Sequence, residues 1–288
     1  MNKLDYLFSI NPDFKELKIQ EIREDEQIIG YHCFAQDKTS FTFSGGTSSN
    51  LEAAKRIAVA EAFERSLLSE IAKDSNSRKD FLIEENPSSS GFAAGFKQEN
   101  TEFRALCEGL ECWAWSKWID DGYKVLRVNK PEKLTKLTKY LLSPFKENLW
   151  FSKSFQIMFK NNILNLNFVV FLGCSENGIF SGSRVSTSMD ELWEHPVIEA
   201  YRNYKNFLLY SQAKFPLTDI IQKRVIYFAK NKQCAIDQIN RASREDWPQP
   251  EILLLKDYRT NHPEVFLTRC LMKNFLSWNL GDVSRFVY

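Results

Sequence analysis

The sequence predicts an α/β (α+β) fold in which mixed sheets are combined with three long helices that carry glutamates. Two observations lead to this class. Segments in which apolar and polar residues alternate, as in strands with one buried face, are interspersed with long apolar helix-forming runs. Each of the three long helices also follows a Ser-Gly turn, so the fold is predicted to contain pseudo-repeated modules.

The first part of the chain is predicted to form a meander of two or three strands over residues 17–43. The turn that follows ends in Asn50, a residue type that commonly caps helices, and a helix is therefore expected over Leu51–Ile71. The second Ser-Gly turn precedes a helix that is expected from about Asn100 to Asp120.

The remainder of the chain is predicted to continue this alternation. A strand over Tyr123–Val128 and a short amphipathic helix over Pro131–Leu142 are expected first. Further strands are expected at Phe155–Phe159, Asn167–Gly173 and Gly178–Ser183. The third long helix is expected from about Met189 to Leu209, with a kink or a restart at Pro196, because a proline inside a helix costs about 3 kcal/mol.

Composition and charge argue against several classes of function. The 38 basic and 37 acidic residues leave a net charge of +1, so no global field attracts nucleic acid or an anionic membrane. Residues 1–14 lack a signal-peptide pattern, and the longest apolar stretch, Ile163–Cys174, is too short to span a bilayer. A cytoplasmic protein without nucleic-acid or membrane partners is therefore expected, and the 14% aromatic content favours a homodimer.

The cysteines, histidines and tryptophans are predicted to have structural roles. The six cysteines contain no CxxC pair and are expected to be free and mostly buried. The three histidines are scattered and give little basis for a metal site. Trp113, Trp115 and Trp118 wrap around a helix that is already apolar, so they are expected in the core rather than on a ligand-binding face.

Three segments share one arrangement, in which a Ser-Gly turn and a loop lead into a helix with an acidic residue near its middle. The serine and the glutamate are Ser44 and Glu61 in the first module, Ser90 and Glu108 in the second, and Ser181 and Glu199 in the third. The separations are 17, 18 and 18 residues. This repetition indicates that the glutamates share a role.

The helices around these acids are predicted to be largely buried. Glu61 and Glu64 lie three residues apart on one face of a helix that is apolar nearly all round, and Glu108 and Glu111 repeat the pattern. A buried carboxylate is costly unless a cation accompanies it, and the motifs contain fewer arginines than acids. Oxygen ligands suit Mg²⁺, so a magnesium site is one interpretation. Ordinary solvated glutamates on a helix surface are the alternative.

These motifs resemble the signatures of the YcaO family. Ala60-Glu61-Ala62-Phe63-Glu64-Arg65 is similar to the first signature, SxxExxER. Residues 90–111 are similar to the second, SNGxAxGN followed by LxExxER, with Gly95 and Glu108 at the family spacing. Residues 196–203 are similar to the third, ExxxQ. The resemblance covers about residues 40–210 and implies a single YcaO-like domain over 1–288, with 211–288 as a C-terminal subregion.

The resemblance implies a function for the acidic residues. Family members bind ATP and Mg²⁺ and activate a backbone amide oxygen of a peptide by phosphorylation, which leads to azolines or thioamides. It assigns Glu61, Glu64, Glu108 and Glu111 to the metal, and Ser44, Glu61, Arg65, Glu199 and Arg202 to the nucleotide. No residue is assigned a catalytic role. The implied substrate is a peptide or protein, as in the maturation of ribosomal peptides, and a partner protein could deliver it.

The chain also departs from the family pattern. Phe96 stands where the second signature has asparagine, Asn100 where it has an acid, and Cys112 where it ends in arginine, and Asn203 replaces the glutamine of the third signature. These changes remove polar groups expected around the nucleotide and thereby favour a second hypothesis. In that hypothesis the chain is a YcaO-like binding or scaffold subunit with an eroded site, which holds a peptide or a partner protein.

Overall fold

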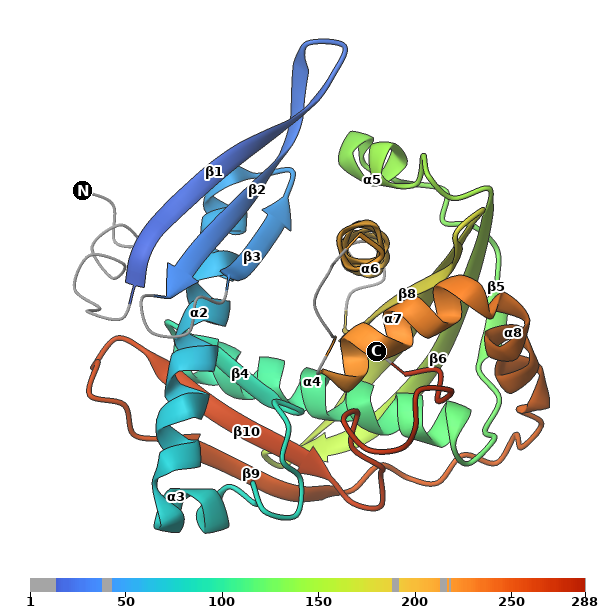
Figure 1. The fold of residues 1–288 in the computed structure, drawn as a ribbon. Coiled ribbons are helices and arrows are strands. Elements are labelled where there is room, and N and C mark those ends of the chain that lie inside the picture. The colour runs from blue at the N-terminus through green and yellow to red at the C-terminus, as the bar shows by residue number, and fades with distance from the viewer. Residues whose placement is uncertain (1–13, 38–42, 188–191, 213–216, 218, 288) are drawn as a thin grey trace. The chain divides into compact units, whose positions relative to one another are not determined.

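The computed structural model describes residues 14–37, 43–187, 192–212, 217 and 219–287 (Figure 1). Helices and strands are interspersed along the chain, which confirms the predicted α/β (α+β) class. The described strands form sheets with the orders β1-β2-β3, β4-β10-β9 and β5-β6-β7-β8. No helix of the described residues is both long enough and apolar enough to cross a membrane.

The chain divides into two compact units, each built from separate stretches of sequence. The first unit contains Met1–Leu106, Thr135–Tyr140 and Leu254–Cys270. The second unit contains Cys107–Leu134, Leu141–Leu253 and Leu271–Tyr288. The expectation of one domain over 1–288 stays a prediction.

The first unit contains the predicted meander and the first glutamate-bearing helix. Its elements are β1 (Phe14–Glu24), β2 (Gln27–Asp37), β3 (Phe43–Ser48), α2 (Leu51–Lys73), α3 (Ser75–Asp80) and β4 (Phe92–Gly95), with most of β9 (Ile252–Tyr258) and β10 (Phe266–Met272) and of the short helix α5 (Lys136–Leu141). The pairings β1–β2, β2–β3 and β4–β10 are antiparallel. Asn50 caps α2 as expected, because its Oδ1 accepts a hydrogen bond of 3.0 Å from the N–H of Ala53.

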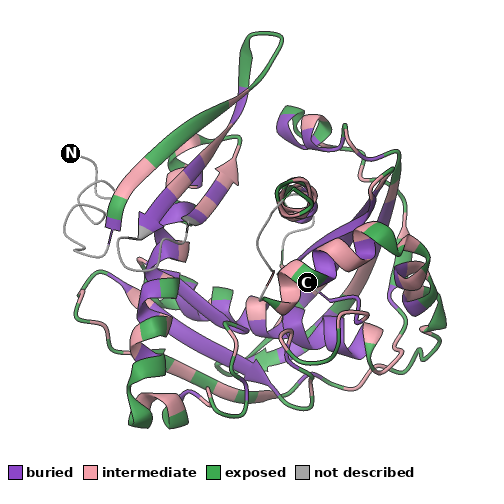
Figure 2. Ribbon diagram, viewed as in Figure 1, coloured by how far each residue is buried: buried purple, intermediate pink, exposed green. Residues whose placement is uncertain are grey.

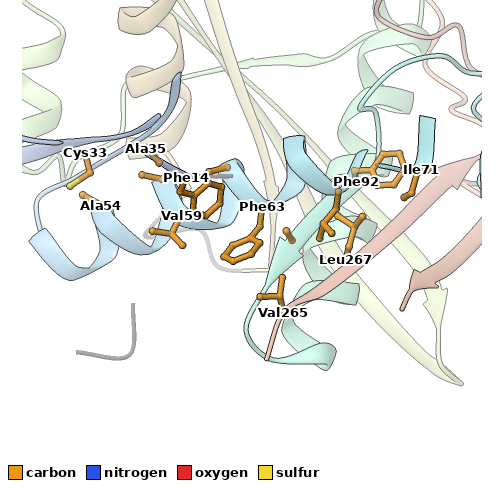
Figure 3. Packing of buried hydrophobic residues seen from close by; sticks show 14 of the residues in the cluster. Phe14, Cys33, Ala35, Ala54, Val59, Phe63, Ile71, Phe92, Val265 and Leu267 are labelled. Carbon is orange, nitrogen blue, oxygen red and sulfur yellow. The ribbon is translucent and has the colours of Figure 1, made fainter. Parts of the chain in front are cut away.

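One face of α2 forms the hydrophobic core of the first unit. Phe63 and Val59 on this helix lie among Phe14, Phe92 and residues of β10 (Figure 3). The opposite face is more open than predicted, because Ile57 is 39% exposed and both Glu61 and Glu64 are only half-buried. The helix is therefore amphipathic, and its glutamates lie at the edge of the buried face.

The second unit is built around a four-stranded antiparallel sheet. Its elements are α4 (Gln98–Ile119) from Cys107 onward, β5 (Leu126–Val128), β6 (Glu147–Phe159), β7 (Asn162–Ser175), β8 (Gly178–Ser186), α6 (Glu194–Tyr210), α7 (Ile220–Lys230) and α8 (Lys232–Arg241). The centre of this sheet is buried (Figure 2). Trp113, Trp115 and Trp118 are at most 2% exposed, which confirms their predicted place in the core.

The third long helix begins later than predicted. Its described start is Glu194, after the turn residues Leu192 and Trp193, so Pro196 lies in the first turn. A proline is tolerated there because the first N–H groups of a helix have no acceptor within the helix. The expected interior kink is therefore absent from α6, and the start of the helix takes its place. Residues 189–191, where the helix was predicted to begin, lie outside the described residues.

Two glycines allow a module strand to lie directly against the helix that follows it. A Cβ atom at Gly46 of β3 would stand 2.1 Å from the carbonyl oxygen of Ala54 in α2. A Cβ atom at Gly182 of β8 would stand 2.0 Å from the carbonyl oxygen of Pro196 in α6. Both distances are far below van der Waals contact and involve backbone atoms that cannot move aside. The first and third modules thus have the same close strand–helix packing.

We expect Gly46→Ala to destabilise the first unit by about 1–3 kcal/mol or more, because the added methyl group must push β3 away from α2. Gly45→Ala is the matched control, since a Cβ atom there would first meet the side chain of His32 at 3.2 Å. Urea unfolding of both variants measures the difference. Equal unfolding midpoints for the two variants would contradict the close-packing argument.

Candidate functional site

Glu61 connects the first Ser-Gly turn to helix α2. Its Oε2 atom accepts a hydrogen bond of 2.8 Å from the backbone N–H of Gly45, and its Oε1 atom accepts one of 2.6 Å from Arg65, one helical turn away. Ser44, which precedes Gly45, is buried. The structure therefore joins the predicted pair Glu61 and Arg65 to the backbone next to Ser44, and both oxygens of the carboxylate are engaged.

His32 lies next to this turn and was not predicted to be near it. A Cβ atom at Gly45 would be 3.2 Å from Cε1 of His32, and the Nδ1 atom of His32 is 2.6 Å from Oγ1 of Thr47. β2 and β3 pair in a register that sets His32 opposite Thr47. The sequence alone does not fix this register, and the histidine therefore looked isolated.

Glu199 has equivalent contacts in the third module. Its Oε2 atom accepts a hydrogen bond of 3.0 Å from the backbone N–H of Ser183, and its Oε1 atom lies 3.2 Å from Nε2 of His195 and 3.5 Å from Arg202. Burial acts to raise the pKa of Glu199, but His195, Arg202 and the Ser183 N–H outweigh it and lower the pKa to about 2. His195 was missed as well, although its position four residues before Glu199 on a helix is a signal for such a pair.

The first and third modules therefore share one hydrogen-bonding pattern. In each, a strand N–H donates to the helix glutamate that follows 16 residues later, and a basic side chain of the same helix contacts the other oxygen. The equivalent donors are Gly45 and Ser183. Gly45 belongs to the first Ser-Gly pair, whereas Ser183 directly follows the third pair, so the structural repeat is offset by one residue from the repeat recognised in the sequence. Ser183 also contacts helix α4 of the second module, through Glu111.

Ser183 joins two acidic residues of the second unit. Its Oγ atom donates a hydrogen bond of 2.5 Å to Oε1 of Glu111 and accepts one of 2.7 Å from Nε1 of Trp115. Because its N–H donates to Glu199, this one residue orients both carboxylates. No sequence motif pointed to Ser183, which lies two residues beyond the serine assigned to the third module.

The environment of Glu111 is unusually acidic. Glu111 is 6% exposed, and burial is the main reason that its pKa lies well above the ordinary value. The negative charges of Glu108 and Glu199 raise it further, whereas the hydrogen bond from Ser183 and the charge of Arg184 oppose the shift only in part. These surroundings therefore favour the protonated form of Glu111.

The donor chemistry of this cluster fits Mg²⁺ held together with phosphates. Among the described residues, no group of three or more His, Cys, Asp or Glu side chains is arranged to hold a metal by itself. Mg²⁺ bound with a nucleotide generally uses one or two carboxylates together with phosphate oxygens and water, so a complete protein cage is not needed. Glu108 and Glu111 in the second unit have suitable oxygens, as do Glu61 and Glu64 in the first.

Of the four residues that depart from the family signatures, Phe96, Cys112 and Asn203 have structural roles. The ring of Phe96 lies edge-on to Phe63 at 6.3 Å and packs against the core of the first unit. Cys112 is 3% exposed, whereas Asn100 is exposed. The amide of Asn203 donates a hydrogen bond of 3.0 Å to the carbonyl oxygen of Ser181 and ties α6 to β8.

All six cysteines are free and all but Cys234 are buried, as predicted.

Comparison with solved structures identifies the fold. No family model matches the chain, and no curated protein matches it at a significant level. The structure of YcaO from Methanopyrus kandleri bound with AMPPCP and Mg²⁺ is similar with a TM-score of 0.62 and 11% identity, over 99% of this chain and 93% of that one. The E. coli microcin synthetase McbBCD complex with pro-MccB17 bound contains a chain with a TM-score of 0.60 and 12% identity, over 89% and 88%.

A heterocyclase in complex with substrate and cofactor has a TM-score of 0.61 and 10% identity, and the match covers 96% of this chain and 52% of that one. These likenesses extend over nearly the whole chain, although the sequences have diverged widely. The fold is therefore that of YcaO proteins, as the motif resemblance implied.

The raised pKa of Glu111 makes stability depend on pH in a defined direction. Between the ordinary value of 4.5 and the raised value, the folded protein holds a proton that the unfolded chain has lost, so stability falls as the pH rises through this window. Each pH unit within the window costs about 1.4 kcal/mol. We expect Glu111→Gln, whose amide oxygen can still accept from Ser183, to gain stability relative to the wild type as the pH rises from 4.5 to 7.5 without Mg²⁺, and the difference between them to be independent of pH below 4.5.

Thermal unfolding from pH 4 to pH 8 in the presence of a chelator measures this effect. Glu99→Gln controls for the removal of one exposed negative charge. A stability difference between Glu111→Gln and the wild type that stays constant across the whole range would show that Glu111 is not held protonated by its surroundings.

Proposed function

We propose that this chain uses ATP and Mg²⁺ to modify a backbone amide of a peptide or protein, by azoline or thioamide formation through phosphorylation of the amide oxygen. The observation that carries this proposal is the geometry at Ser183, which binds the carboxyl groups of both Glu111 and Glu199, with Glu108 close enough to raise the pKa of Glu111. A bound divalent cation would favour the ionised form of Glu111. The M. kandleri YcaO, which has the same fold, is bound with AMPPCP and Mg²⁺, and this supports the choice of ligand.

The side chains of this chain would divide the work of binding and orientation. Glu108 and Glu111 would hold the cation, and Ser183 would fix the direction of the Glu111 carboxylate. When bound, ATP supplies the phosphoryl group that makes the amide oxygen a leaving group. Arg202 is 47% exposed at its side chain and contacts Glu199 at only 3.5 Å, so it can turn towards a phosphate.

The resemblance also assigns roles to residues of the first unit. Arg65 is 45% exposed at its side chain and lies beside Glu61, and the Gly45 N–H holds that carboxylate in place. We assign Glu61 and Glu64 to the metal, and Ser44, Glu61 and Arg65 to the nucleotide, as the resemblance implies. Electrostatic stabilisation by such fixed groups is the main contribution of proteins to phosphoryl transfer.

The substrate and setting of the reaction follow from the same proposal. The McbBCD complex has pro-MccB17 bound, and the heterocyclase structure contains its substrate. We infer that this chain acts on a ribosomal peptide or a protein in the cytoplasm, with a partner protein that delivers the substrate, and that it forms a homodimer.

A second candidate function is a YcaO-like subunit that holds a peptide or partner protein without turnover. The observation that favours it is the replacement of polar signature residues by Phe96, which packs against Phe63, and by Cys112, which is buried. Neither side chain can bind a nucleotide as an asparagine or an arginine would. This candidate predicts an intact fold with no affinity for ATP.

Calorimetric titration of ATP with and without Mg²⁺ decides between the two candidates. We expect Mg²⁺-dependent binding by the wild type that is weakened about tenfold to a hundredfold in Glu111→Gln, because one charged ligand of the cation is lost. Glu64→Ala tests the first unit in the same way, and Glu99→Gln is the exposed-charge control. Absence of binding by a folded wild type would exclude the enzyme and leave the scaffold subunit.

A further inference from the structure

A buried arginine organises residues 276–287, which we call the anchored segment. Arg224 of α7 is 0% exposed, and its guanidinium donates to the carbonyl oxygens of four residues of this segment. The acceptors are Trp278, Leu280 at 2.6 Å, Asp282 at 3.1 Å and Val287 at 3.1 Å. Since a buried guanidinium must satisfy its donors, the path of the anchored segment is tied to α7.

Arg285 and Gln238 hold the same segment from two other sides. Arg285 binds the carboxylate of Asp120 through two hydrogen bonds of 2.8 and 2.5 Å, and Asp120 directly follows α4. Gln238 of α8 accepts from the N–H of Phe286 at 2.9 Å and donates to the carbonyl oxygen of Ser284 at 2.6 Å. Phe286 is therefore fixed by its backbone, independently of its own ring.

The ring of Phe286 reaches the side chain that orients Ser183. Phe286 is 1% exposed and lies edge-on to Trp115, with ring centroids 6.1 Å apart at an angle of 82°. Trp115 has one hydrogen-bond donor, and it points to the Oγ atom of Ser183, which donates to Glu111. Four residues thus form a continuous chain of contacts from the anchored segment to a carboxylate of the proposed cation site.

We propose that Phe286 is a positioning residue for Glu111, which acts through Trp115 and Ser183 and couples the anchored segment to the carboxylate cluster. The indole ring is held between Trp118, Phe168 and Phe286. Removal of Phe286 opens space on one side, so the indole can tilt and its N–H leaves Ser183. The hydroxyl of Ser183 is then free to rotate away from Glu111. The role in cation binding rests on the proposed function, whereas the coupling itself does not.

The experiment uses the full chain and two readouts. The first is the hydrogen exchange of the Trp115 indole N–H, observed by ¹⁵N NMR and assigned by its disappearance in Trp115→Phe. The second is the affinity for ATP with Mg²⁺ by calorimetry. Phe286→Ala is the main variant, and Phe286→Leu, which fills most of the space, guards against a failure to fold. Leu280→Ala is the matched control, because this side chain of the same segment is 39% exposed.

We expect Phe286→Ala to accelerate the indole exchange and to weaken ATP binding, each by about five- to tenfold, with Phe286→Leu intermediate and Leu280→Ala unchanged. We also expect Trp115→Phe to weaken ATP binding similarly, and Phe286→Ala to add nothing in the double variant. Such non-additivity is the signature of one pathway, since a general loss of stability would add in both backgrounds.

The two proposals fail in different ways. If the wild type does not bind ATP, the proposed function is wrong, and the coupling is then judged from the indole exchange alone. If the indole exchange of Phe286→Ala equals that of the wild type, the coupling is overturned, whatever the affinity for ATP. Additive losses of affinity in the double variant would overturn it as well.

Discussion

The hydrogen bond from a strand N–H to a helix glutamate is the interaction on which the arrangement of the site depends. In the first module Gly45 donates to Glu61, and in the third Ser183 donates to Glu199. The bond satisfies a backbone donor and at the same time fixes one oxygen of the carboxylate, so the other oxygen is presented to a cation. The side chain reaches the strand only where strand and helix are in close contact, which explains why a glycine of each strand lies against backbone of the helix.

Ser183 extends this principle from one carboxylate to two. Its N–H and its hydroxyl group hold Glu199 and Glu111 in fixed directions, so the acids cannot move apart to relieve their repulsion. Glu199 has His195 and Arg202 as partners, and its pKa is low. Glu111 has fewer cations near it, and its pKa is high. Identical side chains thus differ in protonation because of their surroundings, and the acid with the raised pKa is the one that would gain most from a bound cation.

The sequence predicted the parts of this molecule that depend on local patterns. Helices α2 and α4, the cap at Asn50 and the buried tryptophans follow from periodicity and residue type, and the YcaO fold followed from motif spacing. The start of α6 was misplaced because the run before Pro196 is helix-like in composition. Ser183 and His32 were missed for another reason. Their roles depend on strand register and on contacts with distant helices, which a single sequence does not encode locally.

The choice between an enzyme and a scaffold depends on which residues of the site lower the stability of the folded protein when no ligand is bound. Phe96 and Cys112 pack against apolar neighbours, and this packing needs no ligand. These two residues therefore do not indicate whether the rest of the site binds a nucleotide. Glu111 is different, since a buried acid beside two other acids lowers the stability of the folded protein at neutral pH. A neutral glutamine could accept the same hydrogen bond from Ser183 without that cost. A binding function that needs the negative charge would offset the cost, whereas a purely structural role would not, and this is the argument for the proposed cation binding at Glu111.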